Sequence, residues 1–75
     1  MIIKFTNVGS RNAHFRVQTK ELTYDILYSA VRPYLLSREI DFYYNPETQK
    51  GSVVVGIVRV VGYFSVEDDE VLVGQ

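Results

Sequence analysis

The sequence predicts an α+β fold: a single helix packed on a curved antiparallel sheet of four to five strands, in the order β-β-α-β-β with a short final strand left open. Three observations predict it. Apolar and polar residues alternate in the first 19 residues and again from residue 40, apolar residues recur every three or four positions between these stretches, and turn-forming residues separate the segments. A compact five-stranded barrel with an inserted helix is the alternative architecture. The 75 residues are expected to form one domain, residues 1–75.

The first 19 residues predict a β-hairpin. Met1–Thr6 alternates as a strand does, and the segment from Asn7 to Asn12 is rich in glycine, asparagine and serine, which favour turns. Ala13–Thr19 alternates again. Because successive side chains of a strand point to opposite faces, one face of this hairpin is expected to be apolar and the other polar and basic.

The spacing of apolar residues changes to three and four after Lys20, which predicts an amphipathic helix over residues 21–36. Thr19 is the predicted N-cap, and Glu21 lies in the first turn, where negative charge is favourable. Pro33 cannot donate a helical hydrogen bond and disfavours helix at the residue before it. The helix over residues 21–36 is therefore expected to kink there, and a helix that ends in a short turn is the alternative.

The last strands are predicted from the segments on either side of a polar loop. Ile40–Tyr44 alternates apolar with polar residues, and residues 45–51 contain asparagine, proline and glycine, which favour turns. The valine-rich segment Ser52–Val66 follows and is predicted to form one long strand or two fused strands. An acidic run at residues 67–70 separates it from Val71–Val73, the candidate for the short final strand.

Ser52–Val66 is apolar on both of its predicted faces. Odd-numbered residues from Val53 to Tyr63 are expected on one face, and even-numbered residues from Val54 to Val66 on the other. A strand covered on one side only alternates apolar with polar residues, so we expect a partner on each face. One helix covers one face of a sheet, and an identical chain related by two-fold symmetry is the simplest second cover. The sequence thus predicts a homodimer.

Two glycines, Gly56 and Gly62, interrupt this valine-rich segment. Glycine inside a strand marks a bulge, a sharp bend or a close approach of backbone, and it also makes room for a large side chain opposite. Both interpretations are open, and the first of them predicts a strongly curved strand. Helix is disfavoured here because β-branched residues and glycine both lower helix propensity.

The composition limits the chemistry that the chain can perform. It has no cysteine and one histidine, which excludes disulfides and the common Cys/His zinc sites. No glycine-rich phosphate loop connects a strand to a helix, and a catalytic base would need an orienting partner that His14 does not visibly have. We therefore expect no catalytic residues, no cofactor and no metal, and we interpret the chain as non-enzymatic.

Neither targeting nor membrane insertion is indicated by the sequence. The N-terminus lacks the basic and apolar regions of a signal peptide, and Ser52–Val66 is too short to cross a bilayer as a helix and contains Arg59. The absence of cysteine is compatible with a reducing compartment. A cytoplasmic protein with no membrane partner is the expectation.

The polar face of the predicted hairpin is a candidate binding surface. Its basic residues are Lys4, Arg11, His14, Arg16 and Lys20. Cations of this kind can bind phosphates. No aromatic residue alternates with them to stack bases, and the net charge of the chain is −1, whereas nucleic-acid binders are usually basic. Nucleic-acid binding through this face is therefore the alternative function.

The aromatic residues predict a contact surface. Six tyrosines and four phenylalanines exceed what so small a core easily holds, and aromatic residues are enriched at interfaces. The candidate interface residues are Tyr24, Tyr28, Val55, Ile57, Tyr43 and Tyr63. Our first hypothesis for function is a small non-enzymatic protein-interaction module, an inhibitor or adaptor that acts by binding another protein.

Overall fold

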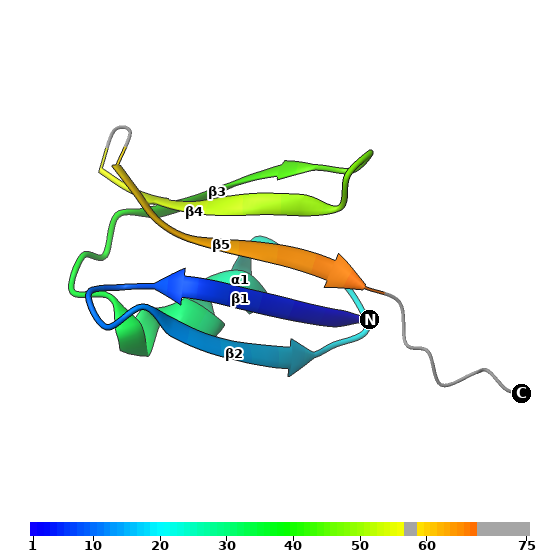
Figure 1. The fold of residues 1–75 in the computed structure, drawn as a ribbon, viewed down its shortest axis with the longest axis horizontal. Helices are drawn as coiled ribbons and strands as arrows, with labels where there is room; N and C mark the ends of the chain where they lie inside the picture. The colour runs from blue at the N-terminus through cyan, green and yellow to red at the C-terminus, as the bar shows by residue number, and fades with distance from the viewer. Residues whose placement is uncertain (57–58, 68–75) are drawn as a thin grey trace, which may run out of the picture.

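The computed structural model describes residues 1–56 and 59–67, which form one antiparallel sheet with an α-helix on one side (Figure 1). Five strands lie in the order β2-β1-β5-β4-β3, so β2 and β3 are the edges of an open sheet. The elements are β1 (Ile2–Val8), β2 (Ala13–Gln18), α1 (Tyr24–Val31), the 3-10 helix η1 (Arg32–Tyr34), β3 (Ile40–Asn45), β4 (Lys50–Val55) and β5 (Arg59–Glu67). The predicted α+β class is confirmed, and the barrel is not formed because the edges do not pair.

The N-terminal hairpin is confirmed, with β1 beginning one residue later and ending two residues later than the predicted strand. β1 pairs with β2 from Ile2↔Gln18 to Val8↔Ala13, and the register shifts between Phe5 and Val8. The turn between the strands uses backbone conformations with positive φ at Gly9 (77°) and Asn12 (52°), in line with the turn predicted from glycine and asparagine.

The helix is shorter than predicted and has a different N-cap. α1 begins at Tyr24, and the hydroxyl of Thr23 accepts a hydrogen bond from the Ile26 amide at 3.2 Å. The Thr19 hydroxyl instead bonds locally to Glu21, in the loop that carries the chain from β2 across to the helix. Thr19 is therefore not the cap, because residues 19–23 are needed for this crossing.

Pro33 ends the α-helix rather than kinking it. α1 stops at Val31, and Pro33 lies in the three-residue 3-10 helix η1, which the Leu35 amide closes by donating to the Arg32 carbonyl at 3.3 Å. The 3-10 hydrogen-bond pattern tolerates this proline because the first residues of a helix have no intrahelical acceptor for their amides. The prediction of a helix reaching residue 36 was wrong, and its alternative of a short turn holds.

Ser52–Val66 is not one long strand but the two antiparallel strands β4 and β5. The chain turns after Val55 at Gly56, which has a φ of 65° and donates its amide to the Glu39 carbonyl at 3.1 Å. Val53 pairs with Gly62, whereas Val54 pairs with Val60, so β5 contains one extra residue at this point. Residues 57 and 58 lie outside the described part of the chain, as do 68–75, which contain the rest of the acidic run after Glu67 and the expected final strand.

The reversal explains why both faces of the segment are apolar. In β4 the core position is the odd-numbered Val53, whereas beyond the register shift in β5 the core positions are the even-numbered Phe64 and Val66. Val54 is also buried but is not part of the core cluster, and at the start of β5 the order is reversed, with Val61 packed against the core and Val60 exposed. The predicted division into one odd face and one even face was therefore wrong. Each half of the segment contributes one row of side chains to the same core.

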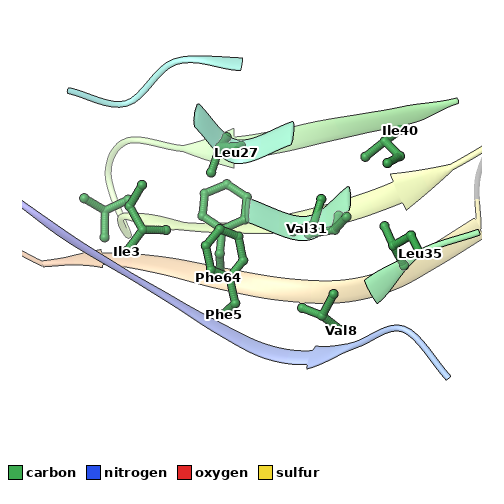
Figure 2. Packing of buried hydrophobic residues seen from close by; sticks show 10 residues of the cluster. Ile3, Phe5, Val8, Leu27, Val31, Leu35, Ile40 and Phe64 are labelled. Atoms are coloured by element: carbon green, nitrogen blue, oxygen red, sulfur yellow. The ribbon is translucent and has the colours of Figure 1, made fainter. Parts of the chain in front are cut away.

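The core lies between the sheet and the segment formed by α1, η1 and Leu35 (Figure 2). Its buried members are Ile3, Phe5, Val8, Leu27, Val31, Leu35, Ile40, Val53, Phe64 and Val66. The ring of Phe5 stacks on Phe15 with centroids 4.8 Å apart and lies 5.9 Å from the ring of Phe64. Aromatic residues of β1, β2 and β5 thus form the centre of this small core.

Glycines make room for the core at two cross-strand positions. A Cβ atom at Gly62 would lie 2.9 Å from Cγ2 of Val8, and one at Gly51 would overlap the ring of Phe64. The interpretation that glycine accommodates a large neighbour therefore holds at Gly62, which also adjoins the register shift, while Gly56 serves the turn.

Candidate interaction surfaces

Two surfaces of the described residues are left uncovered by the fold. The first is the open face, the side of the sheet opposite α1, where the residues that alternate with the core positions of the strands lie. The second is the end groove, a hollow at the end of the sheet where β1 leads into its turn and β5 begins. Figure 1 shows this end on the left, where the β4–β5 hairpin diverges from the β1–β2 hairpin.

The open face brings together three of the five predicted basic residues. Lys4 and Arg16 are direct cross-strand partners on β1 and β2, and His14 lies two residues from Arg16 on the same strand, so it shares their face. Arg11 lies in the turn between these strands, and Lys20 lies in the loop after β2. The predicted basic surface is thus only partly assembled.

A fourth cation, Lys50, joins Lys4 and Arg16 and was missed at the sequence level. Lys50 of β4 is opposite Ser65 of β5, Ser65 is opposite Lys4, and Lys4 is opposite Arg16. These residues form one continuous row across four strands, which we call the cation row. The sequence places Lys50 at the end of a polar loop, and only the strand order brings it into line with the N-terminal hairpin.

One member of the cation row is already paired. The Lys4 ammonium lies 3.1 Å from a carboxylate oxygen of Glu67, and the two side chains are 45% and 49% exposed. Exposed ion pairs of this kind contribute about 0–1 kcal/mol to stability. The pair is therefore weak enough for another anion to compete with Glu67 for Lys4.

Tyr43 and Tyr63 also lie on the open face, one step along the strands from the cation row. Ser52 of β4 lies between them, opposite Tyr43 of β3 on one side and Tyr63 of β5 on the other. Tyr63 is also opposite Thr6 of β1. Tyr43 is 57% exposed and Tyr63 is 52% exposed. Aromatic side chains therefore adjoin the cations after all, because the sheet brings them from strands that are distant in sequence.

The remaining predicted interface residues do not join this surface. Tyr24 and Tyr28 lie on α1, where their rings stand 5.8 Å apart, and the Tyr24 ring packs edge-on against Phe42 at 5.4 Å. Val55 is partly buried against the core, and Ile57 lies outside the described residues. The predicted interface is thus divided between opposite sides of the sheet.

The outer edge of β3 is partly occupied by side chains of the same chain. The Tyr24 hydroxyl donates to the backbone carbonyl of Ile40, and Oδ1 of Asp41 accepts a hydrogen bond from the Phe42 amide at 2.9 Å. The Tyr24 side chain is about half exposed, and partial burial of its hydroxyl, followed by the nearby charge of Asp41, raises the pKa of that hydroxyl above its ordinary value. The neutral hydroxyl is the form that can donate this bond.

The end groove forms because β5 pairs with β1 only from Tyr63 onwards, while Arg59 and Val60 pair with β4. The hollow has a volume of about 640 Å³. Of the six large apolar side chains that the described residues expose, four line it: Tyr34, Leu36, Val60 and Tyr63. The exposed apolar surface of the described chain is thus concentrated at this end.

The walls of the end groove are held by close packing. Tyr34 stacks on Phe15 with ring centroids 4.5 Å apart, and its carbonyl lies so close to Gly9 that a Cβ atom there would overlap it. The Gly9 amide donates to the Val61 carbonyl at 2.9 Å, which ties the β1–β2 turn to β5. A groove with such walls exists before any partner arrives.

The polar residues of the end groove give it a positive character. Among its lining residues, Arg59 is the one that carries a charge, and it is exposed. The other polar lining residues are Asn7, Ser10, Asn12 and Ser37. The groove therefore combines an apolar rim with one cation and several neutral hydrogen-bonding groups.

Comparisons of the chain with protein-family models, with curated proteins and with solved structures gave no match. Within the described residues, no helix has the length and apolar character needed to cross a membrane. The same residues contain no group of three or more histidine, aspartate or glutamate side chains arranged to hold a metal ion.

Proposed function

We propose that this chain is a small non-enzymatic protein-interaction module that binds a segment of another protein in the end groove. The concentration of exposed apolar side chains around this one hollow carries the proposal. Apolar patches on a small domain mark sites of association, and aromatic side chains are enriched where proteins meet. Acting as an inhibitor or adaptor requires such a surface and no catalytic group.

A protein segment suits the end groove better than a small molecule. Ligand pockets bury about 70–90% of a drug-sized molecule within walls that enclose it. Leu36 is fully exposed at the rim, and Tyr63 is half exposed. A small ligand inside the hollow would leave these side chains in water, whereas a peptide segment can fill the hollow and also cover its rim.

The charge of the groove specifies the partner further. Arg59 stands beside the exposed Val60, and guanidinium groups bind carboxylates with two parallel hydrogen bonds. The segment that fits is therefore apolar, with an aspartate or glutamate next to its anchoring side chain. The neutral amide and hydroxyl groups of the groove are suited to bind its backbone.

Selection from a displayed library of random peptides tests this proposal. We expect enrichment of peptides that combine a large apolar residue with an acidic one. Titration of a selected peptide into isotope-labelled protein should shift the amide resonances of the end groove, including Gly9 and Leu36. Leu36→Ser is expected to weaken binding, because Leu36 is exposed and its replacement leaves the core intact.

The charge requirement has its own control. Arg59→Glu should reduce binding of acidic peptides, while Arg38→Glu, the same change at an exposed loop position, should not. A library that yields no binder, or binders whose shifts map to the helix side of the molecule, would contradict the proposal.

A further inference from the structure

We infer that the open face binds single-stranded nucleic acid, with phosphates on the cation row and bases on Tyr63 and Tyr43. This inference goes beyond the protein-binding function and uses the open face, which shares Tyr63 with the end groove. Two independent observations carry it: three cations lie in register across the sheet, and two exposed tyrosines lie beside them. Proteins that bind single strands without sequence preference combine these two features.

The cation row has the dimensions of a backbone track. Lys50, Lys4 and Arg16 lie on β4, β1 and β2, and neighbouring strands of a sheet are about 4.8 Å apart. Three strand-to-strand steps place Lys50 and Arg16 roughly 14 Å apart, with Lys4 between them. A strand of several nucleotides running across the sheet would meet all three cations.

The tyrosines lie where the bases of such a strand would be. Tyr63 is two residues from Ser65, a member of the row, so its Cα lies about 7 Å to one side of the cations. Tyr43 lies two strands away on the same side. Exposed rings beside a line of charge can stack unpaired bases, whereas a duplex keeps its bases in the helix interior. The arrangement therefore favours a single strand.

Two carboxylates moderate the charge of the open face. Glu67 pairs with Lys4 at 3.1 Å, and Asp41 lies two residues from Tyr43 on β3. With a net charge of −1, the chain as a whole has no general attraction for polyanions. Binding must then come from the local row, and removal of the competing Glu67 carboxylate should strengthen it.

Fluorescence anisotropy with a labelled oligothymidine, titrated with protein at several salt concentrations, tests the inference. Each phosphate contact contributes about 0.7 to the slope of log affinity against log salt for a single strand. Arg16→Gln with Lys50→Gln should therefore lower the slope by about 1.4. Tyr43→Ser or Tyr63→Ser should weaken binding by about 5-fold to 150-fold at each position and leave the slope unchanged.

Matched variants separate this surface from general charge. Arg38→Gln and Lys20→Gln remove one cation each away from the row and should leave the affinity within about twofold, allowing for screening of distant charges. Glu67→Gln should increase affinity, a direction that damage to the fold does not produce. Leu36→Ser, which tests the end groove, should have no effect on oligonucleotide binding.

Three results would overturn the inference. The first is the absence of any anisotropy change at low salt. The second is binding of a duplex or of heparin as strong as that of the oligothymidine, together with unchanged oligothymidine binding by the tyrosine variants. The third is a Glu67→Gln variant that binds the oligothymidine no better than the original chain. The second result would identify unspecific attraction of polyanions instead. Because the outcome depends on the cation row and the two tyrosines, of which only Tyr63 lines the end groove, the test can fail while peptide binding in that groove persists.

Discussion

Gly51 of β4 and Phe64 of β5 are cross-strand partners, and the space that Gly51 leaves empty is filled by the Phe64 ring. The same ring lies parallel to Tyr44, with centroids 5.9 Å apart, and edge-on to Phe42. Phe64 is therefore surrounded by rings from β1 and β3 as well as by the β4 backbone. A side chain at Gly51 would overlap both this ring and the backbone carbonyl of Tyr43.

Replacement of Gly51 by alanine is expected to destabilise the fold by about 1–3 kcal/mol, the usual cost of inserting atoms into a packed core. Chemical denaturation measures the change. Gly56→Asn is the matched control, because Gly56 has positive φ with open space around it and asparagine tolerates that conformation. An alanine at Gly51 that leaves stability unchanged would show that both the Phe64 ring and the Tyr43 backbone carbonyl, which a Cβ atom there would also overlap, can move at no cost.

Thr23→Ala should destabilise the protein by about 1 kcal/mol, because it removes the acceptor for the Ile26 amide at the start of α1. Thr23→Ser should retain the cap and most of the stability. Thr19→Ala should cost less, since the Thr19 hydroxyl bonds within a loop. Thermal unfolding of the three variants decides between these positions, and a larger effect at Thr19 would contradict the cap assignment.

Tyr24 makes stability dependent on pH in the alkaline range. Its pKa is raised above 10.0 in the folded chain, so the fold favours the neutral hydroxyl. The resulting stability is fully present below the pKa of the unfolded chain and is lost as pH rises through the folded value. The ultraviolet absorbance of the original chain and of Tyr24→Phe should be titrated with alkali, and the second curve subtracted from the first. The difference curve should show a tyrosine with a pKa above the ordinary tyrosine value. A difference curve at the ordinary tyrosine pKa would contradict this.

The neighbouring charge of Asp41 gives a second test of the same group. Asp41→Asn removes a negative charge that opposes ionisation of Tyr24, so the pKa of Tyr24 should fall toward its ordinary value. Burial is the larger cause and remains, so part of the elevation should persist.

The homodimer stays a prediction, and its reasoning has changed. Within the described part of Ser52–Val66, Val60 and Tyr63 are the large apolar side chains that stay exposed. A chain of 75 residues has little core, and association is a common reinforcement. Light scattering at micromolar protein is expected to give twice the chain mass of 8.6 kDa. A mass of one chain would contradict the dimer. Two variants then locate the contact between the chains: Tyr43→Lys on the open face and Leu36→Lys at the end groove. The substitution that lowers the mass to that of one chain lies at the contact.

Local patterns predicted the parts of the fold that depend on local chemistry. Alternation between Met1 and Thr19 gave the hairpin, and spacing of three and four gave the helix residues that reach the core, such as Leu27 and Val31. Alternation also located the third strand, with Ile40 facing the core. The period of each pattern, two residues in a strand and three or four in a helix, is shorter than the element that contains it. One sequence is therefore enough to recognise such a pattern.

The reversal at Gly56 was missed because β4 and β5 are both valine-rich and the alternation does not break at the turn. Periodicity cannot mark a turn when the residues on both sides are apolar. The sequence signal for the turn was the glycine at position 56, which adopts a positive φ in the structure. A glycine within a valine run is also compatible with a bend or a bulge, so this signal alone did not identify the turn. The alignment of Lys50 with Lys4 was beyond any local pattern, because it depends on β5 lying between their strands.

Tyr24 and Asp41 determine how the sheet can grow. An incoming strand that adds to β3 would need the Ile40 carbonyl and the Phe42 amide. The carbonyl already accepts a hydrogen bond from the Tyr24 hydroxyl, and the amide already donates one to the Asp41 carboxylate. Strand addition at that margin requires two native bonds to break before any new one forms. Growth of the sheet into a filament requires both edge strands, β2 and β3, to accept a neighbouring strand. Two side chains, Tyr24 and Asp41, oppose this at the β3 edge.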